Sequence, residues 1–506
     1  MADYSLDSPF ESTGTWWLPS DPDRKINGTI RYSEEGARLE LDDSFTSIVG
    51  PVFGDQSTTF ERIDGETALG VPMILFHVHQ TGRHMNFGPS GLRQQDRMIS
   101  SRLLIGHQIP DDARFKKVRF RIPGLQHWLS SPLVQRGIER KENDGSIVFH
   151  YRVEGSADES FRLPSIASDV TFTTTWIESR ALDPFSCSVA SEAWVELCPD
   201  EPQPLDWHLK QFATLNYMLS WLSSWSMSPD KIEGINDPHS SVSVLYRFQD
   251  RKPNLSPSQI DLFIPRPLLG IELGVALVNW FEIYSKIEDP CRLAISTSGS
   301  KELWIHVEFL SWMQALEGLH RSILDGNYMD PKAYEPVKKS LVDAIPNIVE
   351  QAHRESLRSR IRYGYQYSLR KRLDELTKRL SEPLRTIILG EGGQFPGSWV
   401  ETRNYYTHWD VALQPTILEP PKMYEASFRI SIFARVLFLQ LMGISDEVVI
   451  QALGGSCHLA QYLIQLNARE HRKRFPDSTA GALMYVSEAS APIQEVADPD
   501  SKEPEV

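Results

Sequence analysis

Two different spacings of hydrophobic residues divide the chain into two parts. From about residue 10 to residue 170, apolar and polar residues alternate in short runs between Gly, Asp and Ser turns, for example in residues 28–43, 71–80 and 115–125. Alternation with a period of two is typical of strands that are buried on one face. We therefore predict a β-rich region made of antiparallel strands.

From about residue 300 onward, apolar residues recur every three or four positions, which is the period of amphipathic helices. The clearest segments of this kind are residues 301–324, 334–357, 367–380 and 423–443. The chain between residues 170 and 290 mixes the two patterns. We predict an α+β multidomain protein with a β-rich N-terminal domain over residues 8–290, which includes inserted helices and a sub-boundary near residue 170, followed by an all-α helical bundle over residues 295–478.

The end of the chain has a different composition. Residues 487–506 are acidic, contain proline and lack aromatic side chains. A segment of this kind cannot bury enough apolar surface to offset the entropy of ordering it. We therefore expect a disordered acidic tail.

Composition and charge limit where the protein acts. With 41% hydrophobic residues among 506, both parts can form an ordinary core. The formal net charge of −15 disfavours non-specific attraction to nucleic acid or anionic membranes, unless basic residues gather in one place. The first residues lack the features of a signal peptide, and the best apolar runs fall short of the ~18 residues that a membrane span needs. We expect a cytoplasmic protein with no membrane contact.

Basic residues do gather in one segment. Residues 351–380 contain nine basic and three acidic residues. Such a patch can neutralise RNA phosphates, and the tyrosines within it can stack on unpaired bases. Arg-rich helix faces are also often merely solvated, and the tyrosines can instead belong to the core. The residues that we predict to contact RNA are Arg358, Arg362, Tyr363, Tyr365, Arg370 and Lys371, together with Tyr405 and Tyr406 further along the chain.

The stretch RNYYTH places Arg403 five residues before His408. With 14 histidines in the chain, a pair at this spacing is expected by chance. Indeed, RLLIGH places Arg102 and His107 at the same distance within a strand-like pattern. The spacing alone is therefore a weak signal, and its surroundings must decide.

The surroundings of RNYYTH favour a helix. Ser398 and Glu401 form the pattern of a capping box, in which two side chains satisfy free amides of a helix's first turn. We predict a helix that begins near Trp399 and stops before Pro415.

On such a helix, Asn404 and His408 share a face, and the long side chain of Arg403 can swing towards them. Three polar groups can then converge on one phosphate. The alternative is an exposed arginine and a hydrogen-bonded surface histidine on an ordinary helix.

RNYYTH resembles the R-x4-6-H motif of HEPN ribonucleases, with Asn404 as the polar second residue. The N-terminal segment over residues 14–45 is also similar to the opening of ApeA-like bacterial proteins. These proteins combine a β-rich region with a C-terminal HEPN bundle and are linked to defence against phage. The resemblance therefore implies a HEPN-type bundle in the C-terminal half.

The resemblance also implies a chemistry. It is metal-independent RNA cleavage, in which the 2′-hydroxyl attacks the adjacent phosphate and leaves a 2′,3′-cyclic phosphate. His408 would move a proton, Arg403 would stabilise charge on the phosphate, and Asn404 would orient the phosphate or the imidazole. No metal or cofactor is implied.

The resemblance further implies partners. Family members commonly dimerise so that two motifs share one cleft, so a homodimer through the bundle is expected. RNA, such as tRNA, is the expected substrate, and the N-terminal domain is expected to sense a phage-derived trigger or to regulate the nuclease during abortive infection. The alternative is a non-catalytic protein that binds a nucleotide or ligand and whose HEPN-like bundle only dimerises.

Two other groups have simpler explanations. His77, His79 and His84 lie close together in sequence, but no nearby carboxylate or cysteine completes a metal site. Cys457 and His458 follow two glycines, which would suit a nucleophile only if a base lay beside the thiol. We predict no metal site and a buried thiol.

Overall fold

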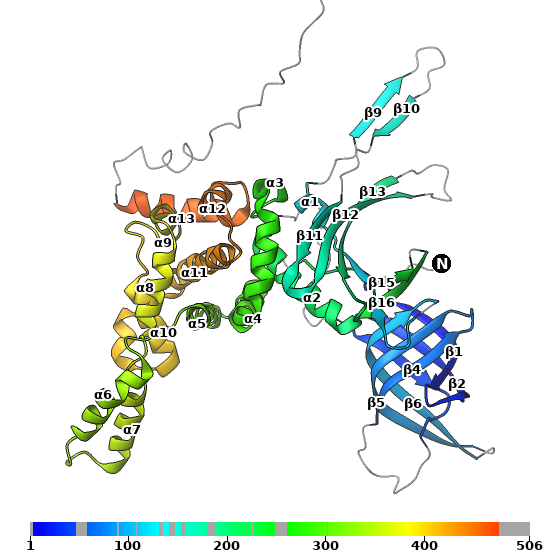
Figure 1. Ribbon diagram of the computed structural model, residues 1–506, viewed down its shortest axis with the longest axis horizontal. Helices are drawn as coiled ribbons and strands as arrows, with labels where there is room; N and C mark the ends of the chain where they lie inside the picture. The colour runs from blue at the N-terminus through cyan, green and yellow to red at the C-terminus, as the bar shows by residue number, and fades with distance from the viewer. Residues whose placement is uncertain are drawn as a thin grey trace, which may run out of the picture. The chain divides into compact units, whose positions relative to one another are not determined.

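The computed structural model describes residues 4–46, 58–88, 91–107, 109–130, 135–140, 147–152, 158–179, 188–223, 227–237, 239–247, 261–300 and 302–474. The chain forms two compact units, one of residues 1–260 and 265–282 and the other of residues 261–264 and 283–506. The first is rich in strands and the second is helical wherever the structure describes it (Figure 1). The predicted fold class, a β-rich region followed by an all-helical region, is confirmed.

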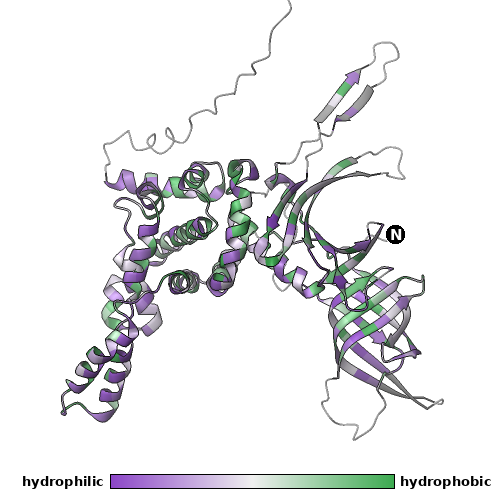
Figure 2. Cartoon of the chain, in the orientation of Figure 1, coloured by the Kyte–Doolittle hydropathy of each residue, from purple (hydrophilic) through white to green (hydrophobic). Residues whose placement is uncertain are grey.

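Six antiparallel strands of the first unit close into a barrel. Strand β6 pairs with both β3 and β5, so the order β6-β3-β2-β1-β4-β5 returns to its starting strand. Along β2, Ile26, Ile30 and Tyr32 are at most 5% exposed, and Figure 2 shows the alternation of hydrophilic and hydrophobic residues in the barrel strands. The strands are β1 (Phe10–Leu18), β2 (Asp21–Ser33), β3 (Gly36–Leu41), β4 (Thr59–Thr67), β5 (Pro72–Gly88) and β6 (Gly91–Ile105).

A tryptophan and a glycine form a close contact in the barrel. Trp16 of β1 lies opposite Gly65 of β4 and is fully buried. A Cβ atom at Gly65 would lie 2.1 Å from the Trp16 ring. The indole therefore fills space that any side chain at position 65 would occupy.

The sheet continues beyond the barrel from β6 through β16, β15, β8, β13 and β12 to β11. Helix α2 packs on this part of the sheet, with the ring of Phe212 stacked on Phe120 of β8 at a centroid distance of 4.0 Å. Trp280 Nε1 donates to the carbonyl oxygen of Thr214 in α2 at 2.7 Å. The elements of this part are β8 (Lys117–Arg121), β11 (Glu159–Leu163), β12 (Ser168–Ser179), β13 (Ser188–Pro199), α2 (Leu205–Leu222), β15 (Lys231–Asp237) and β16 (Ser240–Tyr246).

Shorter elements complete the first unit. Strands β7 and β14 pair with each other, and so do β9 and β10. Their bounds, with those of the short helices, are β7 (Arg114–Phe115), α1 (Leu125–Trp128), β9 (Gln135–Arg140), β10 (Ile147–Arg152), η1 (Pro164–Ile166), β14 (Gln203–Pro204) and α3 (Arg266–Leu269). Helix α4 (Glu272–Gly299) contains the boundary between the units.

The second unit is a bundle built around α11. This helix packs against α5, α9 and α13, and its Ile430, Phe433 and Val436 are fully buried. The helices are α5 (Ile305–Ile323), α6 (Pro331–Asp343), α7 (Gln351–Arg362), α8 (Leu369–Arg379), α9 (Glu382–Leu389), α10 (Gly397–His408), α11 (Pro420–Leu441), α12 (Asp446–Leu453) and α13 (His458–Arg474). A 3-10 helix, η3 (Val411–Thr416), follows α10.

The helical pattern over residues 334–357 forms two helices rather than one. Helix α6 ends at Asp343 and α7 begins at Gln351, with Pro346 between them, where proline lacks the amide that a continuous helix needs. Helix α7 has no buried residue. The predicted tail lies outside the described residues, and none of the described helices is long and apolar enough to cross a membrane.

Candidate active site

Helix α10 carries the RNYYTH stretch, but it begins differently from the prediction. Its N-cap is Pro396, and no side chain makes a capping hydrogen bond at its first turn. The capping box predicted from Ser398 and Glu401 is therefore wrong. Instead, Thr402 Oγ1 donates to the carbonyl oxygen of Ser398 at 2.7 Å and accepts from the amide of Leu418 at 3.0 Å, which ties the helix to the chain that follows it.

The helix also ends earlier than predicted, at His408 rather than just before Pro415. Trp409 adopts a left-handed backbone with φ 52° and ψ 37°. Its amide donates to the carbonyl oxygen of Tyr405 at 2.6 Å, which closes the last turn. His408 is thus the terminal residue of the helix.

Arg403 is bound by a carboxylate of another helix. Its Nη2 donates to Oε2 of Glu317 in α5 at 3.0 Å, and Nη2 of Arg321 donates to the other oxygen of the same carboxylate at 3.0 Å. Nη1 of Arg403 donates to Oδ1 of Asn404 at 3.3 Å. The structure therefore brings Arg403 and Asn404 together and adds Glu317, which the sequence analysis missed.

His408 is in a different environment. Its side chain is exposed, and no residue that the structure describes makes a hydrogen bond or ion pair with the ring. Asn404 lies one turn earlier on the same face of the helix. A step of five residues along an α-helix rises ~7.5 Å and turns ~140° about the axis, so the side chains of Arg403 and His408 leave the helix in different directions. The imidazole is accessible, whereas the Arg403 guanidinium is bonded to Glu317 and Asn404.

The second pair with this spacing, Arg102 and His107, has a different geometry. Arg102 lies in β6, is ion-paired with Asp206, and places its guanidinium over the ring of Tyr246 at 5.7 Å. His107 follows the end of that strand. Five residues of extended chain cover ~16 Å. The same sequence spacing therefore separates an arginine and a histidine much further in a strand than in a helix.

Two family models match the chain. One, ApeA N-terminal domain 1, matches residues 11–280, and the other, Apea-like HEPN, matches residues 310–448. The chain belongs to the ApeA family. Neither the curated proteins nor the solved structures compared with the chain include a match.

The HEPN match of this ApeA-family chain contains Arg403, His408 and Glu317. A HEPN domain is typically a ribonuclease, so the match makes the chain a candidate ribonuclease in a defence context. The candidate site thus lies in the part of the chain where such an activity is expected.

A second histidine of the HEPN domain is structural. His320 is fully buried, its Nε2 bonds to Glu375 Oε2 at 2.9 Å, and Nη1 of Arg372 donates to its Nδ1 at 3.1 Å. Because arginine can only donate, the ring is neutral and its Nε2–H donates to the carboxylate. Burial lowers the pKa of His320. This ring is therefore held in place in its neutral form.

Arg372 in the same cluster holds the turn at Gly326. It is 1% exposed, donates to the carbonyl oxygen of Gly326 at 3.3 Å, and burial lowers its pKa. Gly326 has φ 65°, and a Cβ there would lie 2.2 Å from Nη1 of Arg372. Only glycine fits this position.

The predicted RNA contacts separate into two groups. Arg358, Arg362 and Tyr363 are exposed, and the guanidinium of Arg362 lies 5.7 Å from the Tyr363 ring. Tyr365 instead packs against Tyr334 at a centroid distance of 5.5 Å. Exposure leaves the first three available to a ligand, whereas Tyr365 is partly used in packing.

Arg370 lies near α10. A Cβ atom at Gly397, the first residue of that helix, would be 3.1 Å from Nη1 of Arg370. Arg370 also pairs with Asp374 at 3.2 Å, and Lys371 lies 5.6 Å from the centre of the Tyr367 ring. Arg370 is thus a predicted RNA contact that lies beside the first residue of the motif helix.

The histidines of residues 77–84 and the thiol of Cys457 were the remaining candidates from the sequence. Among the described residues, no group of three or more His, Cys, Asp or Glu side chains could hold a metal ion. His77, His79 and His84 are exposed. Cys457 is 5% exposed, and burial raises the pKa of its thiol. The prediction of a buried thiol is confirmed.

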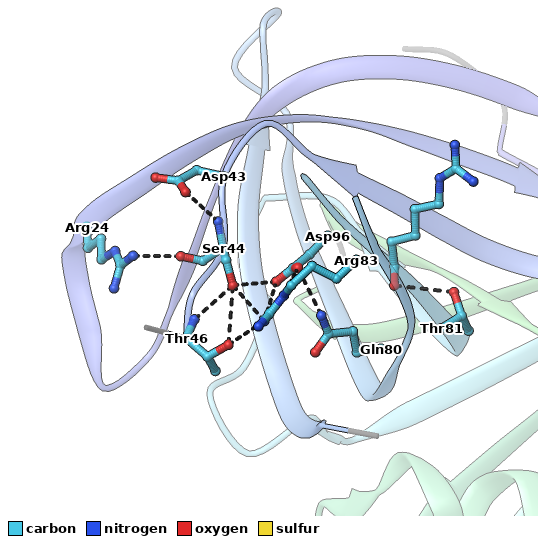
Figure 3. A network of polar contacts seen from close by, with 9 residues as sticks. Arg24, Asp43, Ser44, Thr46, Gln80, Thr81, Arg83 and Asp96 are labelled. Atoms are coloured by element: carbon cyan, nitrogen blue, oxygen red, sulfur yellow. Dashed lines mark hydrogen bonds and ion pairs between the residues drawn. The ribbon is translucent and has the colours of Figure 1, made fainter. Parts of the chain in front are cut away.

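The ApeA N-terminal domain holds its own polar cluster, which Figure 3 shows. Asp96 of β6 is 1% exposed and accepts from Nε of Arg83 at 2.7 Å, from Gln80 at 2.9 Å and from Ser44 at 2.6 Å. Nη2 of Arg83 also donates to Thr46 Oγ1 at 2.5 Å and to Ser44 Oγ at 2.9 Å. The cluster ties the segment after β3 to strands β5 and β6.

Proposed function

We propose that the chain is a metal-independent endoribonuclease that acts in anti-phage defence by abortive infection. The 2′-oxygen of the RNA forms a bond to phosphorus while the bond from phosphorus to the 5′-oxygen breaks, which leaves a 2′,3′-cyclic phosphate and a 5′-hydroxyl. One proton leaves the 2′-hydroxyl, and one proton reaches the departing 5′-oxygen. The substrate is a cellular or phage RNA, such as tRNA.

The observation that supports this proposal is that one helix of the HEPN match, α10, carries both an exposed imidazole, His408, and a partly exposed guanidinium, Arg403. His408 moves a proton, which contributes on the order of 10² to 10⁴ in rate. Arg403 donates to phosphate oxygens as negative charge develops on them, and Asn404 orients the guanidinium through the contact at 3.3 Å.

One imidazole cannot be base and acid within the same step. We therefore propose that two copies of the chain associate through their bundles, so that each cleft contains two histidines. Mass measurement in solution checks this: a dimer is expected, and a strict monomer that cleaves RNA contradicts it.

The N-terminal domain is proposed to regulate the nuclease by sensing a phage-derived trigger. The physical division of the chain into a β-rich unit and a helical unit supports separate roles. If the proposal holds, the purified chain has low basal cleavage, and extract from infected cells raises it.

A specific contact supports a second candidate function, that of a non-catalytic nucleotide-binding or ligand-binding protein with a dimerising bundle. Arg403 already has a carboxylate partner, Glu317, at 3.0 Å. A phosphate would have to compete with this partner or share the guanidinium with it. In this alternative the bundle dimerises and the β-rich unit recognises the ligand.

A set of matched variants tests the proposed function. Mixed RNA is incubated in excess EDTA with the wild type, Arg403→Ala, His408→Ala and, as the control, His107→Ala. His107 is also an exposed histidine five residues after an arginine, but it lies in the β-rich unit. Loss of cleavage with His408→Ala and Arg403→Ala, but not with His107→Ala, is expected.

Two results contradict the proposal. One is cleavage that survives in His408→Ala, and the other is the absence of cleavage in the wild type both alone and with extract from infected cells. The second result, together with retained ligand binding, favours the non-catalytic alternative.

A further inference from the structure

Five aromatic rings gather around the C-terminal end of α10. Trp304 and His306 come from the start of α5, and Tyr405, Tyr406 and Trp409 come from α10 and its C-cap. We refer to these five side chains as the ring platform. None of them except Tyr405 and Tyr406 was a candidate from the sequence.

The rings form a continuous series of contacts. His306 stacks on Tyr406 with centroids 5.6 Å apart and an interplanar angle of 16°. Trp304 lies 6.2 Å from His306, and Trp409 lies 5.9 Å from Tyr406 and 5.8 Å from Tyr405. Two helices therefore contribute to one aromatic surface.

The two tryptophans at its ends are unusually exposed. Trp304 is 76% exposed and Trp409 is 67% exposed. Most large indoles are buried to a high degree, because their apolar area is costly to leave in water. Exposed rings that contact further aromatic rings mark a surface that is complementary to another flat apolar group.

The backbone of Trp409 adds a second observation. A helix that ends in a left-handed residue normally has glycine there, because a side chain strains this conformation. Trp409 has φ 52° instead. This strained conformation lies at the residue that follows His408, and it fixes where the backbone presents the indole.

We propose that the ring platform binds unpaired nucleobases of RNA next to the phosphodiester that is cleaved. The proposal rests on the proposed function and adds a substrate class: single-stranded or looped RNA rather than a duplex, whose bases are stacked on each other. Base stacking on aromatic side chains tolerates any sequence, since every base has a flat π face.

The location and the chemistry of the platform favour a nucleobase over a second copy of the chain. Consecutive Cα atoms are about 3.8 Å apart, so Trp409 lies directly beside His408. The rings of Tyr405, Tyr406 and His306 also carry polar edges, which suit hydrogen bonding to bases as well as stacking.

The test measures binding with an RNA that cannot be cleaved. Two 12-nucleotide strands carry 2′-O-methyl groups throughout, and one of them has abasic sites in place of its central bases. The proteins are the full-length wild type, Trp304→Ala, Trp409→Gly and the control Tyr424→Ala. Tyr424 is 53% exposed in the same bundle, and its ring contact is with Tyr462 rather than with the platform.

We expect Trp304→Ala and Trp409→Gly each to weaken binding of the base-bearing strand by about 10-fold to 100-fold. The abasic strand should bind the wild type and both variants equally weakly, and Tyr424→Ala should behave as the wild type with both strands. Trp409→Gly suits the left-handed backbone, so it is expected to fold, and thermal unfolding checks that it does.

Equal binding of the base-bearing strand by the wild type and by both variants overturns the proposal. The proposal is also overturned if these variants change from dimer to monomer and RNA binding falls only as far as the fraction of dimer falls. The platform would then be a subunit interface. The strand cannot be cleaved, so the difference in binding between the two strands reports on base contacts independently of cleavage. A wild type that binds bases through the platform but cleaves nothing contradicts the nuclease and leaves the platform intact.

Discussion

Each unit of the chain contains an arginine bound to a carboxylate, Arg83 with Asp96 in the first and Arg403 with Glu317 in the second, and the two pairs differ in the burial of the carboxylate. The side chains of Arg83 and Arg403 are equally exposed, at 23% each. The partner side chains differ in exposure: that of Asp96 is 0% exposed and that of Glu317 is 20% exposed. Exposure of the arginine alone therefore does not distinguish a structural pair from a candidate active site.

The hydrogen bonds distinguish them. Arg83 donates to Asp96, Ser44 and Thr46, and Asp96 receives further bonds from Gln80 and Ser44. Arg403 donates only to Glu317 and Asn404 within the described residues. Each guanidinium has five N–H groups and keeps unused donors, so the difference lies in the carboxylates: Asp96 is buried and accepts from three side chains, whereas Glu317 is partly exposed and accepts from two. The first pair holds a fold together, and the second can still accept a substrate.

The largest expected effect is on stability, in the barrel. Asp96→Ala leaves the charge of Arg83 without its buried partner, and we expect the free energy of unfolding of the first unit to fall by about 3 kcal/mol. Chemical denaturation followed by far-UV circular dichroism measures this. The control is Glu35→Ala, which removes an exposed partner of Arg38 and should change stability by less than about 0.5 kcal/mol.

Retained stability in Asp96→Ala would show that the Arg83 cluster is not a structural tie. The Arg83–Asp96 pair and the Arg403–Glu317 pair would then no longer differ in their contribution to stability.

A buried histidine sharpens the same contrast through pH. His208 of α2 is fully buried, its Nε2–H donates to the carbonyl oxygen of Phe115 at 3.1 Å, and burial lowers its pKa to about 4. In the unfolded chain this histidine has a pKa near 6.5, so between pH 6.5 and pH 4 the unfolded state binds a proton that the folded state does not bind. Stability is therefore complete above pH 6.5 and falls as the pH drops towards 4.

From these values, the folded state loses about 2 kcal/mol between pH 7 and pH 5 through His208 alone. Denaturation of the wild type and His208→Asn at the two pH values measures the loss, which should be largely absent in the variant. An unchanged pH dependence in His208→Asn contradicts the assignment.

The smallest expected effect concerns the orientation of Arg403. Glu317→Ala removes the acceptor at 3.0 Å, so the guanidinium is no longer held and kcat should fall about 10-fold. Glu317→Gln keeps one acceptor oxygen and should restore most of the activity. The control is Arg321→Ala, which leaves the bond between Glu317 and Arg403 in place.

Glu317 has a positioning role only if kcat falls while the unfolding temperature stays constant. Higher activity in Glu317→Ala would show instead that the carboxylate competes with phosphate for Arg403.

The sequence predicted local features well and long-range partners poorly. Alternation in residues 28–43 predicted β2 and β3, but closure of the barrel depends on the long-range pairings of β3 with β6 and of β1 with β4, which no local pattern reveals. The helix that contains RNYYTH was predicted correctly. Its predicted capping box was wrong, because the N-cap is Pro396, whose ring fixes the backbone at the start of the helix. Local spacing thus gives the element but not its ends.

The same limit applies to the candidate site. Arg403 and Asn404 are adjacent in sequence and contact each other. Glu317 lies 86 residues before Arg403, and nothing in the spacing of charges joins them. Trp304 and Trp409 were missed for the same reason, since they form one surface only when α5 and α10 pack together.

The most direct test of the central claim uses a short RNA with a single 2′-hydroxyl, placed at a position that the wild type cuts, with every other sugar 2′-deoxy. Wild-type protein in excess EDTA should convert this RNA to a product ending in a 2′,3′-cyclic phosphate, which mass spectrometry detects. His408→Ala should give no such product. Cleavage of the fully deoxy strand, or a product with a free 3′-hydroxyl, would contradict the account.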